Sequence, residues 1–235
     1  MVKRRALISL DIILTLHLFT LYFGGANRVL IASSSATMRL LLLTGFLGSG
    51  KTTLVIKLAR FAVARGQKVA ILVNEIGEIG IDNQLMRQLA LNVWELLNGC
   101  ICCTLSADLV STLQQLDSDY SPDLVLIEPS GAADPRSILS ALPYYRGRPL
   151  EGMWTVSMLD PLRLEMLIEV MTPLITSQIK HADVVLVTKC DEATPEEVER
   201  AHRAAREYNP AARVLESRRD TPIDMLAAEI APWLS

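Results

Sequence analysis

The chain has 235 residues, a formal net charge of -3 and 50% hydrophobic residues, which suffices for the core of one ordinary α/β domain. It carries no basic stripe with interleaved aromatic residues, so nucleic acid is not an expected partner. Only four cysteines occur, three of them between Cys100 and Cys103. They make a poor disulfide framework and indicate reduced thiols in a reducing compartment.

The first 37 residues differ from the rest of the chain. A basic triplet precedes an apolar run from Ala6 to Phe23, as in a signal peptide or a membrane anchor. Asp11 and His17 interrupt this run and weaken it as a membrane span. Because nucleotides and reduced thiols belong to the cytosol, we expect a cytoplasmic protein without membrane association that starts at Met38. Residues 1–37 would be an artefactual extension, with a cytosol-facing anchor as the alternative, and the domain would span residues 38–235.

A complete phosphate-binding loop follows, Gly45-Phe46-Leu47-Gly48-Ser49-Gly50-Lys51-Thr52. Residues 39–44 predict a buried strand that enters the loop, and residues 52–65 predict a helix that leaves it. The glycines let backbone N–H groups converge on the β-phosphate, Lys51 reaches the β and γ oxygens, and the Thr52 hydroxyl holds Mg²⁺. The predicted helix turns its N-terminus to the phosphates. A glycine-rich turn without a ligand is the alternative, which the flanking strand and helix disfavour.

The middle of the chain carries a thiol cluster. Residues 68–74 predict a strand and residues 75–83 a polar, glycine-bearing loop suited to a switch. We then expect a short helix at 84–90, a strand at 92–97 and a turn at 98–103.

Three sulfurs lie within four residues of that turn, on Cys100, Cys102 and Cys103. They can offer thiolates to one soft or borderline ion and leave a coordination position open. Core packing of small apolar cysteines and a redox pair are the alternatives. Glu75 of the preceding loop is a candidate further ligand, as are Glu78 and Asp82, although these carboxylates could equally serve Mg²⁺ or be solvated.

The next motif concerns the γ-phosphate. Residues 107–116 predict a helix and residues 123–128 a buried strand, which carries Glu128 to the carboxyl edge of the sheet. The segment Glu128-Pro129-Ser130-Gly131 matches the place of the acidic Mg²⁺ shell and the γ-phosphate sensor of P-loop NTPases. Glu128 would orient a Mg²⁺-bound water, and the Gly131 N–H would meet the γ-phosphate. Turn chemistry alone is the alternative.

Strands and helices continue to alternate in the C-terminal half. The strands are expected at 154–159, 183–188 and 213–216, and the helices at 162–170, 173–181, 195–208 and 222–233. Near-continuous apolar strands in such an alternation predict an α/β fold, a three-layer P-loop NTPase G domain with a mostly parallel central sheet. Right-handed crossovers would bring the carboxyl ends of the strands, with their loops, to one edge.

Thr188-Lys189-Cys190-Asp191 ends one apolar strand, where a G protein keeps its guanine-recognition loop. Asp191 can accept from N1–H and the exocyclic N2 of guanine, and adenine lacks both donors, so the wrong base would leave a buried charge unpaired. Lys189 would lie against the base with its aliphatic stem. The expected nucleotides are therefore GTP and GDP, with a solvated Lys/Asp pair as the alternative.

Taken in order, these motifs resemble the CobW-like family of P-loop GTPases, the metallochaperone relatives of the urease and hydrogenase nickel-insertion GTPases. The resemblance covers the Walker A loop including Thr53, the asparagine-glutamate switch, the C-x-C-C metal motif, the E-x-S-G-x-A-D-P segment and the approach to the guanine loop, at residues 45–53, 73–82, 96–103, 128–135 and 178–191. It implies a GTPase that binds Zn²⁺, Co²⁺ or Ni²⁺ at the three thiols. Hydrolysis would be coupled to delivery of the metal, or of a metal-containing cofactor.

The chain departs from that family in one respect. Full-length members carry a second, C-terminal domain, whereas this sequence ends at Ser235 directly after the G domain. The expected target is therefore a separate metalloprotein or corrinoid protein. No arginine finger or water-positioning glutamine is identifiable, so we expect slow intrinsic turnover, accelerated by a partner or by a nucleotide-dependent homodimer. A small-molecule kinase, and a zinc sensor or thiol buffer with weak nucleotide turnover, are the alternative functions.

Overall fold

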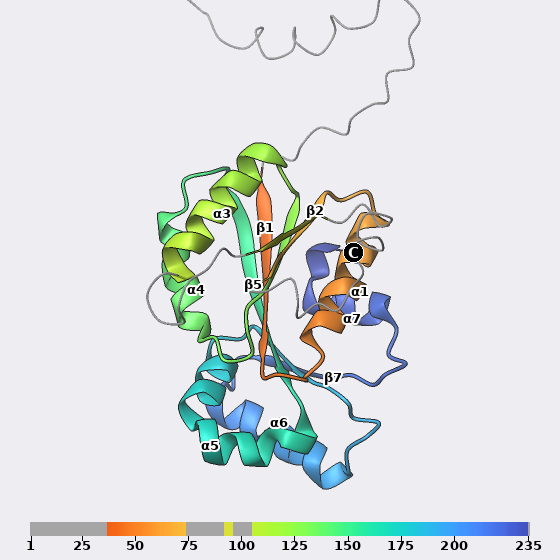
Figure 1. Cartoon of the computed structure of the whole chain (residues 1–235). Coiled ribbons are helices and arrows are strands. Elements are labelled where there is room, and N and C mark those ends of the chain that lie inside the picture. The colour runs from red at the N-terminus through yellow and green to blue at the C-terminus, as the bar shows by residue number, and fades with distance from the viewer. Residues whose placement is uncertain (1–36, 74–91, 96–104, 235) are drawn as a thin grey trace, which may run out of the picture. The chain divides into compact units, whose positions relative to one another are not determined.

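The computed structural model describes residues 37–73, 92–95 and 105–234 (Figure 1). Contacts divide the chain into two units, Met1–Ser33 and Ser34–Ser235, and every described residue belongs to the second. The N-terminal extension, the helix expected at 84–90, the candidate ligand Glu75 and the three cysteines of the thiol cluster lie outside the described residues. Those interpretations stay predictions.

The described strands form one seven-stranded sheet in the order β3-β2-β4-β1-β5-β6-β7. Every pair of neighbouring strands in this described sheet is parallel, which confirms the predicted fold class. The central position of β4 and β1 explains the apolar runs at residues 40–43 and 124–127, since both faces of a parallel sheet are covered. The strands are β1 (Met38–Gly45), β2 (Val69–Val73), β3 (Asn92–Glu95), β4 (Leu124–Glu128), β5 (Leu150–Leu159), β6 (Val184–Val187) and β7 (Arg213–Glu216).

Helices cover the two faces of this sheet. The described ones are α1 (Lys51–Val63), α3 (Leu105–Asp119), α4 (Pro135–Ala141), α5 (Pro161–Lys180), α6 (Pro195–Tyr208) and α7 (Ile223–Ile230), with 3₁₀ turns at Leu142–Tyr144 and Pro232–Leu234. In Figure 1, α3 and α4 lie on one side of β1, and α1 and α7 lie on the other. The structure thus has the three layers that the sequence predicts.

Alternate residues of β1 pack against the helices on the two faces of the sheet. Leu40 and Leu42 pack with α3 and α4, whereas Leu41 and Leu43 pack with α1 and α7. Successive side chains of a strand point to opposite faces, so a run of four leucines places two buried side chains on each face of the sheet. This places β1 at the centre of the domain, and its last residue, Gly45, opens the phosphate loop.

The structure corrects the prediction at α4 and agrees with it at α5. Helix α4 was not expected; Asp134 caps it by accepting from the Arg136 N–H at 3.0 Å, and Pro135 occupies its first position. The two helices expected at 162–170 and 173–181 correspond to the two halves of α5, which meet at non-helical backbone at Met171 (φ -133°, ψ 34°) ahead of Pro173. Proline lacks an N–H and crowds the preceding turn, which explains a kink there.

None of the helices within the described ranges combines the length and apolar character needed to cross a bilayer.

Candidate functional site

The phosphate loop lies at the carboxyl end of β1, where its backbone requires glycine. Gly45, Gly48 and Gly50 have φ values of 135°, 82° and 95°, a region that other residues adopt at a cost. A Cβ on Gly45 would also lie 2.5 Å from the Met158 carbonyl oxygen of β5. Gly50 precedes α1 without a side-chain cap, so the N–H groups of the first helical turn can bind an anion.

Lys51, Thr52 and Glu128 come together beside this loop. The Lys51 ammonium donates to the Phe46 carbonyl at 3.3 Å, and Lys51 is only 7% exposed. The Thr52 hydroxyl donates to Glu128 Oε1 at 2.7 Å, across from α1 to the end of β4. A hydroxyl and a carboxylate in contact are the hard oxygen donors that Mg²⁺ prefers. The residues present therefore fit a magnesium ion.

Gly131 lies directly against the phosphate loop. A Cβ at this position would lie 2.6 Å from the Leu47 nitrogen and 3.1 Å from the Phe46 carbonyl carbon. Since neither backbone atom can yield without moving the loop, only glycine fits. The structure thus places the segment after β4 against the phosphate loop, and the sequence motifs predict that these two segments share one site.

Helix α5 holds the segment that contains Gly131. The Gln178 amide donates to the Gly131 and Ala133 carbonyls at 3.2 and 3.3 Å, and the Ser177 hydroxyl donates to Asp134 Oδ1 at 2.7 Å. Burial alone would raise the pKa of Asp134, but the hydrogen bonds from Arg136 and Ser177 lower that pKa to about 2. The carboxylate thus stays ionised, as a helix cap requires.

The guanine-type loop follows β6. Lys189 has a φ of 54°, and its ammonium lies 2.6 Å from Asp160 Oδ2, an ion pair whose carboxylate is 3% exposed. Asp160 also caps α5 by accepting from the Leu162 N–H at 3.1 Å. Asp191 Oδ1 accepts from the Arg219 N–H at 3.2 Å. Charge and backbone contacts thus tie this loop to α5 and to the loop after β7.

Cys190 serves the loop structurally. Its thiol lies 3.4 Å from the Val187 carbonyl, and its N–H donates to the Ser217 carbonyl at 3.1 Å. Burial raises the pKa of the Cys190 thiol, which keeps it protonated and unreactive at neutral pH.

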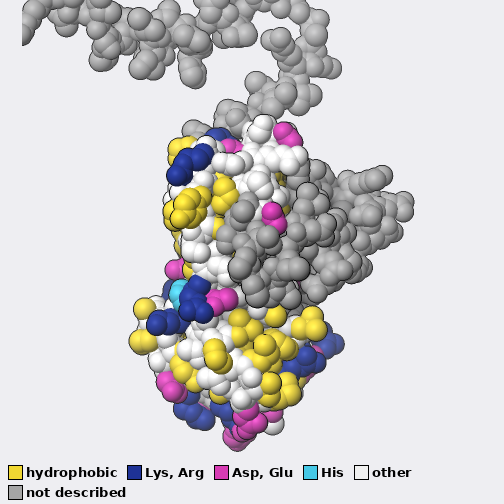
Figure 2. Space-filling view, turned by 60° about the vertical axis from the view of Figure 1, so that its left-hand side comes forward, with side chains coloured by type: hydrophobic (Ala, Val, Ile, Leu, Met, Phe, Trp, Pro, Cys, Tyr) yellow, Lys and Arg dark blue, Asp and Glu magenta, His cyan; other side chains and the backbone are white. Residues whose placement is uncertain are grey.

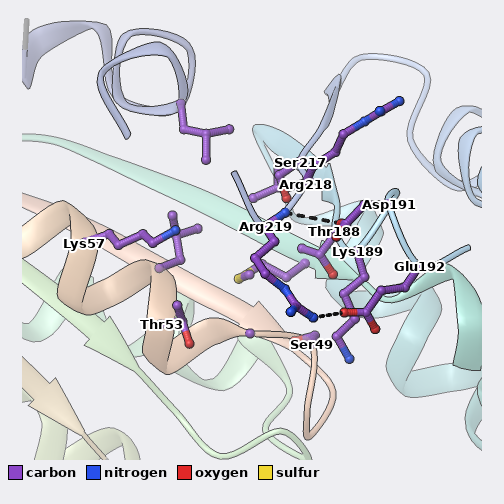
Figure 3. A pocket seen from close by; sticks show the side chains of 15 residues that line it. Ser49, Thr53, Lys57, Thr188, Lys189, Asp191, Glu192, Ser217, Arg218 and Arg219 are labelled. Carbon is purple, nitrogen blue, oxygen red and sulfur yellow. Dashed lines mark hydrogen bonds and ion pairs between the residues drawn. The ribbon is translucent and has the colours of Figure 1, made fainter. Parts of the chain in front are cut away.

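A cavity of about 250 Å³ joins the phosphate loop to the guanine-type loop. Figure 3 shows Thr53 and Lys57 of α1 along one side and Asp191 and Arg219 across from them. The cavity runs from Ser49 and Gly50 to the loops after β6 and β7, so a phosphate group and a base can occupy its two ends. Its lining residues are Ser49, Gly50, Thr53, Leu54, Lys57, Met158, Leu186, Thr188, Lys189, Asp191, Glu192, Ser217, Arg218, Arg219 and Leu226.

Several lining and supporting residues were missed from the sequence. Arg218 and Arg219 follow β7, and the Arg219 guanidinium pairs with Glu192 at 2.7 Å. Their place after a strand was a usable signal, because the carboxyl ends of parallel strands share one edge. Arg163 donates to the Leu47 carbonyl at 3.2 Å. This contact and those of Gln178 join elements that are distant in sequence, so no local sequence pattern predicts them.

The predicted transition-metal ligands lie outside the residues that the structure describes. Within 37–73, 92–95 and 105–234, no three His, Cys, Asp or Glu residues are grouped so that they could hold a metal ion. Cys100, Cys102, Cys103 and Glu75 fall outside these ranges.

Three features define a P-loop NTPase G domain. They are a phosphate loop after the central strand, an acidic residue at the end of the neighbouring strand and an aspartate-bearing loop at the far end of the cavity. The model of the family "CobW/HypB/UreG, nucleotide-binding domain" matches residues 39–216. The chain belongs to this family, which confirms the resemblance seen in its motifs.

Two curated relatives are similar to this chain in sequence. The zinc chaperone YeiR of Escherichia coli is 36% identical over 160 residues, 66% of this chain and 47% of YeiR. The zinc chaperone YjiA of the same organism is 34% identical over 182 residues, 74% of this chain and 55% of YjiA. The chain thus spans about half the length of these curated relatives.

Solved structures share the fold. The Zn(II)-bound YjiA GTPase from E. coli superposes with a TM-score of 0.56 at 27% identity, over 79% of this chain and 58% of that one. The hydrogenase maturation factor HypB from Archaeoglobus fulgidus gives 0.62 at 17% identity, over 85% and 91% of the two chains. The HypB comparison supports the fold alone.

Proposed function

We propose that this protein is a GTP-binding and GTP-hydrolysing switch of the metallochaperone type. It couples hydrolysis to the binding and delivery of a divalent metal, Zn²⁺, Co²⁺ or Ni²⁺, or of a metal-containing cofactor, to a separate target protein. The observation that carries the nucleotide half is the continuous cavity from the phosphate loop to Asp191. The similarity to YeiR and YjiA, both named zinc chaperones, supports the metal half.

The nucleotide half of the proposal assigns roles to the phosphate loop and the residues beside it. Lys51 and the N–H groups of Gly48, Ser49 and Gly50 bind the β and γ oxygens, and Thr53 lies beside them. Thr52 and Glu128 would hold Mg²⁺, which when bound offsets phosphate charge.

At the far end, the Asp191 carboxylate accepts from guanine N1–H and N2, next to Thr188 and the stem of Lys189. Gly131 turns its N–H to the γ-phosphate and so distinguishes GTP from GDP.

A chain of contacts supports coupling between the γ-phosphate and the thiols. Gly131 is three residues from Asp134, which caps α4, and Ile138 of α4 shares a core with Leu109 and Leu113 of α3. The cysteines precede α3, which begins at Leu105. Movement of the Gly131 segment on hydrolysis would therefore shift α4 and α3, and with them the sulfur geometry.

Exposed apolar side chains support a protein partner at this face. Leu47 of the phosphate loop is 65% exposed, and Leu162 and Met166 of α5 are 43% and 53% exposed. Figure 2 shows hydrophobic side chains gathered at the height of α5 and α6. A target protein, or a second copy in a nucleotide-dependent homodimer, could cover them. The proposed compartment is the reducing cytoplasm, where GTP and thiolates coexist.

A single-turnover GTPase assay tests the nucleotide half. Wild-type protein should hydrolyse GTP slowly and prefer GTP to ATP by about 100-fold or more, because adenine leaves the Asp191 carboxylate unpaired. Lys51→Ala should abolish turnover, and Lys180→Ala, which removes an exposed lysine at the end of α5, should not. Equal activity of Lys51→Ala and wild type would overturn the assignment, and an ATP preference would favour a kinase.

A metal titration tests the coupling. Wild type and a Cys100/Cys102/Cys103→Ser variant are titrated with Zn²⁺, Co²⁺ and Ni²⁺ in the GDP and GTP-analogue states. We expect thiol-dependent affinity that differs between the two states. Thiol-dependent affinity that ignores the nucleotide would identify a metal buffer and contradict the switch.

A further inference from the structure

Gln178 is a buried side chain of α5 that faces two parts of the phosphate site. Its residue is 1% exposed, although it lies on a helix whose other face is open to solvent. Its amide nitrogen donates to Gly131 O at 3.2 Å and to Ala133 O at 3.3 Å. One amide thus holds two carbonyls of the short turn that the Ala133 N–H closes on Ser130 O at 3.0 Å.

The oxygen of the same amide has no partner among the described residues. Gln178 Oε1 is buried and accepts a hydrogen bond from none of them. The residue Gln178 lines a small cavity of about 10 Å³ together with Phe46, Leu47 and Ser49 of the phosphate loop. Ser49 is 2% exposed, and its hydroxyl is likewise buried without a described hydrogen-bond partner.

Two buried polar atoms of this kind are unusual, because the large majority of such groups are hydrogen-bonded. One belongs to the phosphate loop and the other to a residue that lines the same small cavity, so a rearrangement of that loop could pair them.

The contacts around Gly131 restrict the conformation of its backbone. Its Cα lies so close to the phosphate loop that an added Cβ would meet Leu47 N at 2.6 Å. Asp134, on the other side of the turn, is held by Ser177 and caps α4. With Gly131 O, Ala133 O and Asp134 all held, the backbone of Gly131 has few orientations left. Gln178 supplies two of these three constraints.

We propose that Gln178 is a positioning residue for γ-phosphate recognition: it holds the Gly131 N–H toward the phosphate loop and thereby sets the ratio of GTP to GDP affinity. This inference rests on the proposed function, since it assigns Gln178 to the same nucleotide site. GDP has no group that reaches Gly131, so loss of Gln178 affects GTP binding selectively.

Two substitutions test the role. Gln178→Met keeps the length of the side chain and removes the donor, whereas Gln178→Glu places a carboxylate against two carbonyl oxygens. The matched control is Asn209→Asp, because the Asn209 amide also donates to carbonyls at the end of α5, those of Ile179, Lys180 and Ala182. It removes the same kind of contact without touching the Gly131 turn.

Equilibrium affinities for fluorescent GDP and for a non-hydrolysable GTP analogue are measured with Mg²⁺. Gln178→Met should weaken GTP-analogue binding about 10-fold, the scale of one lost hydrogen bond, with GDP affinity changed less than about 2-fold. Gln178→Glu should be more severe. Asn209→Asp should leave the ratio of the two affinities at the wild-type value.

An unchanged GTP-to-GDP ratio in Gln178→Met, or an equal change in Asn209→Asp, would overturn the proposal. Should both Gln178 variants fail to fold, Ser177→Ala loosens the same turn through Asp134 and should shift the ratio in the same direction by a smaller factor; no shift there would also overturn it. If wild-type protein binds neither nucleotide, the proposed function itself fails. If wild type hydrolyses GTP and the ratio stays constant, only the role of Gln178 fails.

Discussion

The two ends of the nucleotide cavity differ in what builds them. At the phosphate end, backbone atoms approach so closely that neither Gly45, beside Met158 of β5, nor Gly131, beside Leu47 of the phosphate loop, has room for a Cβ. At the base end, side chains hold the loop after β6: the Lys189–Asp160 ion pair joins it to the start of α5, and the Arg219–Glu192 pair joins it to the loop after β7. Steric exclusion acts at one end and electrostatic matching acts at the other.

This difference has a consequence for substitution. A clash between backbone and Cβ cannot relax without moving the loop, so changes at the phosphate end should act as all-or-none losses. Charge contacts at the base end are shared among several groups and partly solvated, so changes there should be graded. The following predictions test that contrast, from the largest expected effect to the smallest.

Gly131→Ala should produce the largest loss. The added Cβ would lie 2.6 Å from Leu47 N, so the segment must move away from the phosphate loop. Loss of one backbone donor at a charge-bearing transition state typically costs about 100-fold or more in rate. Single-turnover GTP hydrolysis measures it, with Gly66→Ala as control, because Gly66 has φ 79° but no neighbour within 4 Å of a Cβ. Full activity of Gly131→Ala would break the steric half of the comparison.

Asp191→Asn should change the base preference rather than abolish binding. The amide cannot accept from both guanine donors, and GTP affinity should fall about 10- to 100-fold, as for a lost hydrogen bond to a charged group. Its NH₂ can instead donate to the C2 carbonyl of xanthine, so XTP should bind better than GTP. Competition binding measures both, with the exposed Asp119→Asn as control. GTP affinity equal to wild type would remove Asp191 from base recognition.

Lys189→Met should act mainly on stability. It leaves the buried Asp160 carboxylate without its 2.6 Å partner, and Lys189 is partly solvated, so we expect a loss of about 1–3 kcal/mol. Urea unfolding measures it. Addition of Asp160→Asn should recover part of the loss, because the unpaired charge is gone. A double variant less stable than Lys189→Met would show that the helix-capping role of Asp160 outweighs the pair.

Arg136→Gln should give the smallest effect, visible in its pH dependence. The folded-state pKa of Asp134 is about 2, below the ordinary 3.8, so its contribution to stability is present above pH 3.8 and is lost as the pH falls through 2. Without Arg136, that pKa should rise toward 3.8. The melting temperature should fall by less than about 3 °C at pH 7, and the difference from wild type should shrink as the pH falls toward 2 and vanish below it. A difference of the same size at pH 7 and at pH 2 would contradict the electrostatic cause.

Much of the fold could be predicted because its signals are local. The apolar strands, the phosphate loop and the helix after it are contiguous in sequence, and alternation of strands and helices leaves few topologies once crossovers are right-handed. The break within α5 could be expected because Pro173 is a strong helix breaker, and the backbone is indeed non-helical at Met171. Helix α4 was missed because its seven residues are too few for a clear period.

The amino-acid sequence by itself determined the family and predicted the nucleotide chemistry, since Gly45 to Thr52, Glu128, Gly131 and Asp191 are recognisable from residue type and spacing. It also determined the parallel sheet, which burial of uninterrupted apolar strands on both faces demands. Only the tertiary structure decided how these motifs are held. Gln178, Arg163 and Asp160 of α5 reach three different loops, and contacts between segments so far apart in the chain have no sequence period to reveal them.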